Sequence, residues 1–122
     1  MFIKDLKDCT YFQAEDKSIL CELLHPDREE RALKMGFSLA QAIVKPGQST
    51  RAHKLKTSSE IYYILEGEGI IHIEDETASV HAGQVVYIPP NSKQFLQNIG
   101  YSDLIFLCLV YPQWKREDEV VY

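Results

Sequence analysis

From Phe37 to Tyr111 the chain alternates short runs of strand-forming residues with turn residues, and this pattern constrains the fold more than any other feature. Aromatic, β-branched and other apolar residues fill the runs, and glycine, proline or asparagine separates them. The predicted strands are 37–45, 51–56, 60–66, 69–74, 78–81, 84–88, 94–98 and 103–111, preceded by one at 18–24. Many short strands at this spacing predict an all-β sandwich or barrel.

Two stretches of this region place chemically distinctive residues at fixed intervals. The first holds two glycines, a histidine and a glutamate: Gly47, His53, Glu60 and Gly67. Leu55 lies two positions after the histidine. The second combines a glycine and a proline with three amide side chains: Gly83, Pro89, Asn91, Gln94 and Asn98.

These stretches resemble the first and second motifs of the cupin superfamily. The first motif has a second histidine where this chain has Leu55, and the second motif has a turn glycine and a histidine where this chain has Asn91 and Gln94. All other fixed places match. The resemblance implies a double-stranded antiparallel β-helix, also called a jelly-roll barrel, of the small single-domain cupin type with a conserved type-2 barrel.

A chain of 122 residues is expected to form one domain. Residues 1–36 are predicted to form an N-terminal arm and a first strand that packs on the barrel. Residues 37–111 are predicted to form the cupin barrel, and residues 112–122 a charged C-terminal tail anchored by Trp114.

In metal-binding cupins three histidines and one glutamate hold a first-row metal. The resemblance carries these ligand positions to His53, Leu55, Glu60 and Gln94, and leucine has no atom that can bind a metal. The resemblance therefore implies a weak divalent metal site made of His53, Glu60 and Gln94. In the alternative, these three side chains hydrogen-bond one another around water in a metal-free pocket.

The residues leave open whether the protein is an enzyme. A metal-dependent enzyme would use the cation to polarise a small oxygenated metabolite. A metal-free isomerase, epimerase or lyase would act on a sugar-like substrate, with His53 or Glu60 as the base and Tyr62 as the acid, because Tyr62 shares a strand face with Glu60. A non-catalytic module would only bind a small molecule.

The strand predicted over 103–111 is apolar on both faces. Its Cys108 is expected to be an inert thiol of the core, because apolar surroundings raise the pKa of a thiol. One face of this strand fills the barrel, and the other needs a cover. A second copy of the chain is the expected cover, which predicts a homodimer.

The net charge of -5 argues against nucleic acid and anionic membranes as partners. The sequence has no hydrophobic run of the length of a signal peptide or a membrane span. Its three cysteines, Cys9, Cys21 and Cys108, are odd in number and widely spaced, so we expect no disulfide and a reducing cytoplasmic location.

Overall fold

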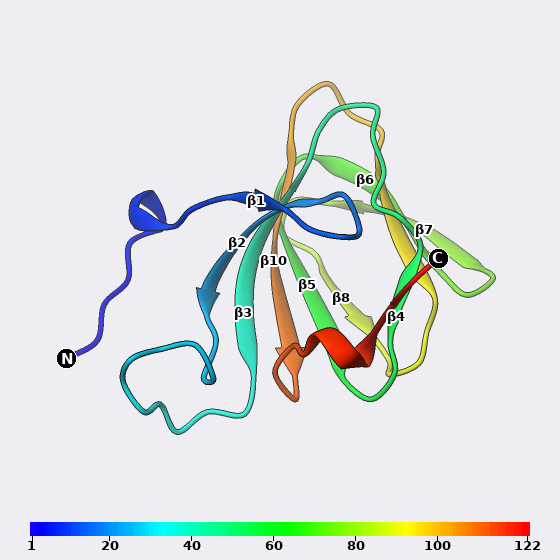
Figure 1. Ribbon diagram of the computed structural model, residues 1–122. Helices are drawn as coiled ribbons and strands as arrows, with labels where there is room; N and C mark the ends of the chain where they lie inside the picture. The colour runs from blue at the N-terminus through cyan, green and yellow to red at the C-terminus, as the bar shows by residue number, and fades with distance from the viewer.

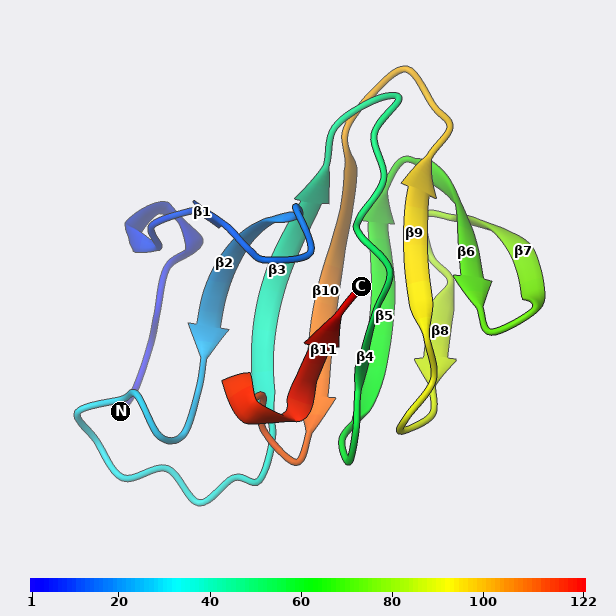
Figure 2. The ribbon, with the colours of Figure 1, turned by 45° about the vertical axis from the view of Figure 1, so that its right-hand side comes forward.

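The structure, a computed structural model, describes residues 1–122 as two antiparallel sheets packed face to face (Figure 1, Figure 2). The larger sheet has the order β1 (Phe12–Gln13), β2 (Ile19–Leu24), β3 (Ser38–Val44), β10 (Leu104–Tyr111), β5 (Ser59–Glu66) and β8 (Val85–Ile88). The smaller sheet has the order β11 (Glu119–Val121), β4 (His53–Leu55), β9 (Gln94–Asn98), β6 (Glu68–Ile73) and β7 (Glu76–His81). Two single-turn 3₁₀ helices, η1 (Leu6–Asp8) and η2 (Arg116–Asp118), lie near the termini.

The predicted all-β jelly-roll fold is confirmed, and every predicted strand is present with each end within two residues of its predicted position. Two short strands were not predicted. β1 lies in the N-terminal arm and pairs with β2, and β11 lies in the C-terminal tail and pairs with β4. Both the arm and the tail are therefore hydrogen-bonded to a sheet.

The core between the sheets follows from the alternation of side chains along each strand. In β10 every second residue is buried, from Leu104 through Phe106 to Val110. Opposite them, β6 and β9 contribute Ile71 and Leu96, which are also buried. This packing holds the two sheets together and leaves room for polar side chains at one end of the interior.

Two turn positions show why the motif spacing is fixed. Gly67 has φ +93°, and a Cβ atom there would lie 2.7 Å from the carbonyl oxygen of Asp103, so only glycine fits. Asn91, which replaces the turn glycine of the second motif, has φ 63°. Asparagine tolerates this left-handed conformation better than most residues, so the turn keeps its shape.

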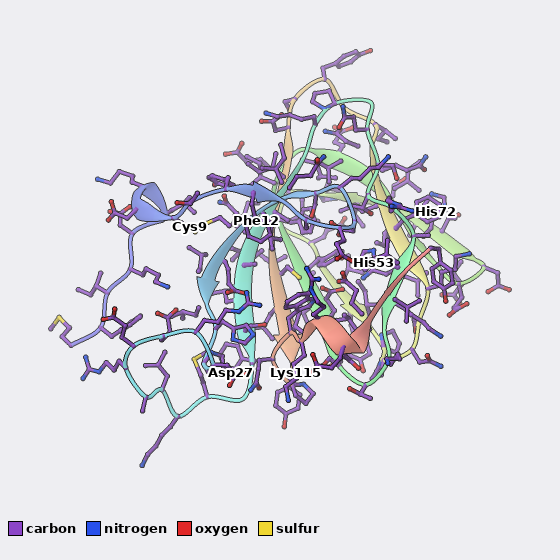
Figure 3. The ribbon with its side chains drawn as sticks, viewed as in Figure 1. Cys9, Phe12, Asp27, His53, His72 and Lys115 are labelled. Carbon is purple, nitrogen blue, oxygen red and sulfur yellow. A yellow bond between two sulfur atoms is a disulfide. The ribbon has the colours of Figure 1, made fainter.

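The prediction that the chain has no disulfide is wrong. Cys9 and Cys21 form one, with their Cα atoms 6.0 Å apart, and it ties the arm to β2 (Figure 3). Spacing along the chain did not reveal the pair because the arm turns back onto the outer surface of the larger sheet. The cytoplasmic location stays a prediction, without the support of unpaired cysteines. Neither 3₁₀ helix is long or apolar enough to cross a membrane.

We expect Cys9→Ser to lower the free energy of unfolding by about 3 kcal/mol, because the disulfide closes a loop of 12 residues in the unfolded chain. Urea unfolding followed by fluorescence measures this change. A thiol reductant should lower the stability of the unmodified protein by a similar amount, and Thr10→Ser on the exposed neighbouring residue is the matched control. Equal stability of the Cys9→Ser and unmodified proteins would contradict a disulfide that holds the arm.

Candidate functional site

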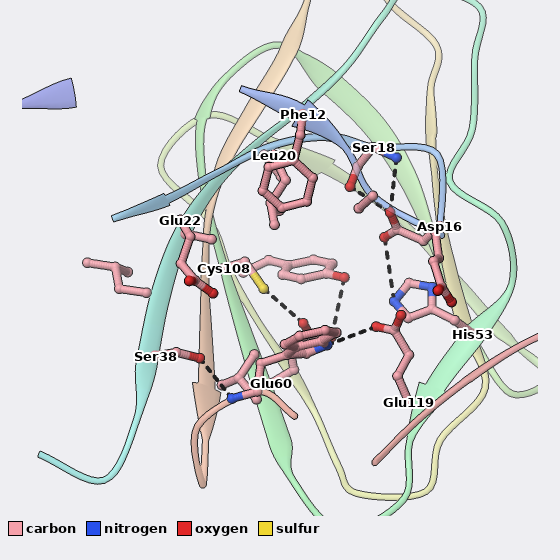
Figure 4. Close-up of a pocket in the computed structure, with 18 of the residues that line it drawn as sticks. Phe12, Asp16, Ser18, Leu20, Glu22, Ser38, His53, Glu60, Cys108 and Glu119 are labelled. Carbon is pink, nitrogen blue, oxygen red and sulfur yellow. Dashed lines mark hydrogen bonds and ion pairs between the residues drawn. The ribbon is translucent and has the colours of Figure 1, made fainter. Parts of the chain in front are cut away.

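A cavity of about 240 Å³ lies inside the barrel (Figure 4). Its walls are inward-facing residues of the larger sheet, among them Leu20, Tyr62 and Phe106. The arm covers one side with residues 12–16, and the tail covers another with Trp114 and Glu119. The cavity thus depends on both chain ends as well as on the barrel.

His53 reaches the cavity from β4 of the smaller sheet, and only 2% of its surface is exposed. Its Nδ1–H donates to the carbonyl oxygen of Arg51 at 2.8 Å, which fixes the ring orientation. Its Nε2 atom forms no hydrogen bond and lies 3.8 Å from Oδ2 of Asp16 (Figure 4). Asp16 is held in turn by the backbone N–H and the hydroxyl of Ser18, at 3.0 and 2.7 Å.

Glu60 lies on β5, where its carboxylate is buried and bonded through both oxygens. One oxygen accepts from the side-chain amide of Gln94, and the other accepts from the thiol of Cys108 at 2.8 Å. The hydroxyl of Tyr62 donates to the carbonyl oxygen of Gln94 at 3.0 Å. Gln94 is therefore fixed between Tyr62 and Glu60.

These surroundings shift the proton affinities of the buried groups. Burial raises the pKa of Glu60, and the facing His53 only partly opposes this effect. Burial alone would lower the pKa of His53, but the carboxylates of Asp16 and Glu60 raise it above 6.5 overall. Burial, reinforced by the charge of Glu60, raises the pKa of both Tyr62 and Cys108 well above their usual values. Tyr62 and Cys108 therefore remain protonated donors at neutral pH.

The profile of the family described as "Cupin domain" matches residues 40–110. The chain is a cupin. It is 44% identical over 104 residues to an uncharacterized protein of Methanocaldococcus jannaschii, covering 85% of this chain and 81% of that protein. It is 32% identical over 89 residues to an oxalate-binding protein of Thermotoga maritima, covering 73% and 74%. A Streptomyces nucleoside dehydratase shares the fold, with a TM-score of 0.77, 16% identity and coverage of 100% of this chain and 91% of that one.

The four cupin ligand positions do not fit a first-row metal in this arrangement. Leu55 is a buried core residue without a donor atom. Both oxygens of Glu60 accept hydrogen bonds within the protein, and the amide of Gln94 is bonded at both ends. No group of three histidine, cysteine, aspartate or glutamate side chains is placed to hold a metal ion. The metal role of His53, Glu60 and Gln94 stays a prediction that this donor set does not favour.

The sequence-predicted residues lie together inside the barrel: Gln94 bonds to Glu60 and Tyr62, and it lies opposite His53 in the register of β4 and β9. His53, Glu60 and Tyr62 line the cavity, whereas Gln94 does not. Cys108 belongs to the core, as expected, and it also lines the cavity.

Three residues that the sequence analysis did not assign to the site complete it: Asp16, Trp114 and Glu119. The indole N–H of Trp114 donates to Glu119 at 3.1 Å, which aligns both at the cavity wall. Trp114 was predicted only as the anchor of the tail. Nothing in the spacing of Asp16 or Glu119 relates them to His53, because they belong to the arm and the tail rather than to the motifs.

The raised pKa values of Glu60 and His53 predict a pH-dependent stability. The folded protein retains protons that the unfolded chain loses above pH 4.5 at Glu60 and above pH 6.5 at His53. The stability that both groups contribute is present at lower pH and is lost as pH rises through their raised folded pKa values. We therefore expect Glu60→Gln to flatten the fall of the free energy of unfolding as the pH rises above 4.5.

Urea unfolding at several pH values measures this slope. Glu76→Gln, at an exposed position of β7, is the matched control and should keep the slope of the unmodified protein. If the free energy of unfolding fell equally steeply with pH in Glu60→Gln and in the unmodified protein, the raised pKa of Glu60 would not be the source of the pH dependence.

Proposed function

We propose that the protein binds a small oxygenated molecule in the barrel cavity and that Nε2 of His53 contacts it. The observation that carries this proposal is a ring nitrogen that borders the cavity, forms no hydrogen bond and has the carboxylate of Asp16, 3.8 Å away, as its charged neighbour. Buried polar groups normally have a partner, so this atom is suited to bonding with a ligand or with water that a ligand displaces.

The size and lining of the cavity favour a small ligand with both polar and apolar parts. Its volume of about 240 Å³ is below the roughly 300–1,000 Å³ typical of sites for drug-sized molecules. Polar groups gather around His53, while Phe12, Phe106 and Trp114 offer aromatic surface. The names of the oxalate-binding relative and the nucleoside dehydratase connect each of those proteins with an oxygenated small molecule.

We expect His53→Gln to weaken binding of such a molecule by about tenfold or more, because a hydrogen bond to a charged group contributes about 1.5–3 kcal/mol. The NMR signals of the His53 ring, titrated with glucose, glucosamine, glucuronate, uridine and oxalate, measure this binding. His72→Gln is the matched control, because His72 lies outside the cavity and bonds to Gln97. Failure of every compound to change the His53 signals would overturn the proposal.

A metal-free enzyme acting on a sugar-like substrate is the second possibility, and the geometry favours His53 as its proton-transfer group. The carboxylates of Asp16 and Glu60 raise the pKa of His53 against the effect of burial, which suits it to give and take a proton near neutral pH. Tyr62 is less suited to act as the acid, because its hydroxyl donates to Gln94 and burial raises its pKa well above 10. Turnover of the bound compound that disappears in His53→Gln would separate this enzyme from a binding module.

A divalent cation held by His53, Glu60 and Gln94 is the remaining alternative. It would require Glu60 to exchange its bonds with Gln94 and Cys108 for the metal. Elemental analysis of protein purified without a chelator distinguishes this alternative from the metal-free ones.

We also propose a homodimer in which a second copy covers the outer face of β8, β5 and β10. Neighbouring outward residues there are apolar, with Tyr63 opposite both Val85 and Leu107 in the register of the sheet. Val85 is 65% exposed, Tyr87 60% and Tyr63 44%, so the chain itself leaves this surface open. Contiguous apolar surface of this kind is typical of protein interfaces.

Light scattering at micromolar concentration should therefore give the mass of two chains. Val85→Lys together with Tyr87→Lys should shift the protein toward the monomer, because a charge would be buried unpaired in the interface. Tyr101→Lys, at a fully exposed loop residue, is the control and should leave the dimer intact. A monomer in the unmodified protein would contradict this proposal.

A further inference from the structure

The charges around the cavity are unequal. Five carboxylates line it, those of Glu15, Asp16, Glu22, Glu60 and Glu119. The only basic side chains among the lining residues are Arg28, Arg116 and His53. The charge that a ligand of this cavity can carry therefore depends on which of these groups are already paired with one another.

Both arginines are already engaged with carboxylates. Arg28 bonds to Glu22 at 2.8 Å, and its guanidinium lies 5.3 Å from the ring centroid of Trp114. Arg116 lies 3.5 Å from Glu15 in a pair whose side chains are 81% and 59% exposed. An exposed pair of this kind is screened by water and projects little charge into the cavity.

Three carboxylates remain, and they share a single basic partner. Asp16 lies 3.8 Å from His53, and the charges of Glu60 and Glu119 also act on the imidazole. Burial raises the pKa of Glu60 and of Glu119, and once these carboxyls ionise the cluster carries an excess of negative charge even with His53 protonated. An anionic ligand would meet these carboxylates at short range, and the repulsion between like charges would weaken its binding.

A ligand with a positive charge would instead be attracted to these carboxylates. Asp16 is 14% exposed, so its carboxylate is partly desolvated yet accessible from the cavity. Trp114 and Phe12 add aromatic surface, which attracts cations through the negative face of the ring. The unbonded Nε2 of His53 remains available to a hydroxyl of the same ligand.

We propose that the ligand of this cavity is a small oxygenated molecule that carries an ammonium group, of the amino sugar or amino alcohol class. This inference rests on the proposed function and adds the charge of the ligand to it. The chain would thereby differ from its oxalate-binding relative, because oxalate is a dianion. Asp16 and Glu119 would bind the ammonium group, and His53 would bind a hydroxyl.

Three hexoses that differ in charge test this inference: glucosamine with an ammonium group, glucose with none, and glucuronate with a carboxylate. Titration of the His53 ring signals at about pH 6.5, where glucosamine is cationic, gives the three affinities. We expect glucosamine to bind about tenfold or more tightly than glucose, and glucuronate to bind more weakly than glucose. Asp16→Asn should remove most of the preference for glucosamine over glucose, whereas Glu76→Gln on β7 should change neither affinity.

The outcomes separate the two proposals. Equal affinities, or tighter binding of glucose or glucuronate, would overturn the charge inference and leave the proposed function standing. A preference for glucosamine that persists in Asp16→Asn and in Glu119→Gln would also overturn it, because the charge would then act from elsewhere. No response to any of the three hexoses would overturn this inference, and the proposed function would fall only if uridine and oxalate were also without effect.

Discussion

The interior of this barrel is organised by the buried carboxylate of Glu60. A carboxylate removed from water costs several kcal/mol unless its oxygens are bonded. Here the amide of Gln94 and the thiol of Cys108 supply the bonds. Glu60 and Cys108 belong to the larger sheet and Gln94 to the smaller one, so the bond from Gln94 also joins the two sheets.

A shared metal would bind Glu60 and His53 together, whereas here the two side chains have separate partners. Glu60 is satisfied by neutral donors, and His53 is therefore left without a bond to it. The imidazole instead turns toward Asp16 and the cavity. Gln94, which replaces the motif histidine, thus stabilises this hydrogen-bond network, because its amide donates to Glu60 and accepts from Tyr62 at once.

The fold could be predicted from the sequence because it depends on local signals. Alternation along the strands and turn residues at their ends located every principal strand, and Asn91 preserved a turn that the motif assigns to glycine. The interior positions of His53 and Glu60 followed from the resemblance to the cupin motifs, and alternation along the strand placed Tyr62 on the same face as Glu60. The role of Gln94 as a hydrogen-bonding partner of Glu60 was one of two open alternatives.

The part of the site that Asp16 and Glu119 form could not be predicted, because it depends on contacts between segments far apart in the chain. Asp16 meets His53 only because the arm folds back, and Glu119 reaches the cavity only because β11 pairs with β4. The family profile ends at residue 110 and begins at residue 40, so these carboxylates lie outside it. Relatives with the same barrel can therefore differ in cavity charge through their chain ends alone.

The arm also connects the cavity with the outer surface of the larger sheet. Within eight residues it supplies Cys9 to the disulfide, Tyr11 to a hydrogen bond with Gln41, and Asp16 to the cavity. Gln41 pairs with Leu107 in the register of the sheet and so lies on the outer face next to the exposed apolar residues. Because one short segment contacts both faces of the sheet, whatever packs on the outer face can influence how firmly Asp16 is held against His53.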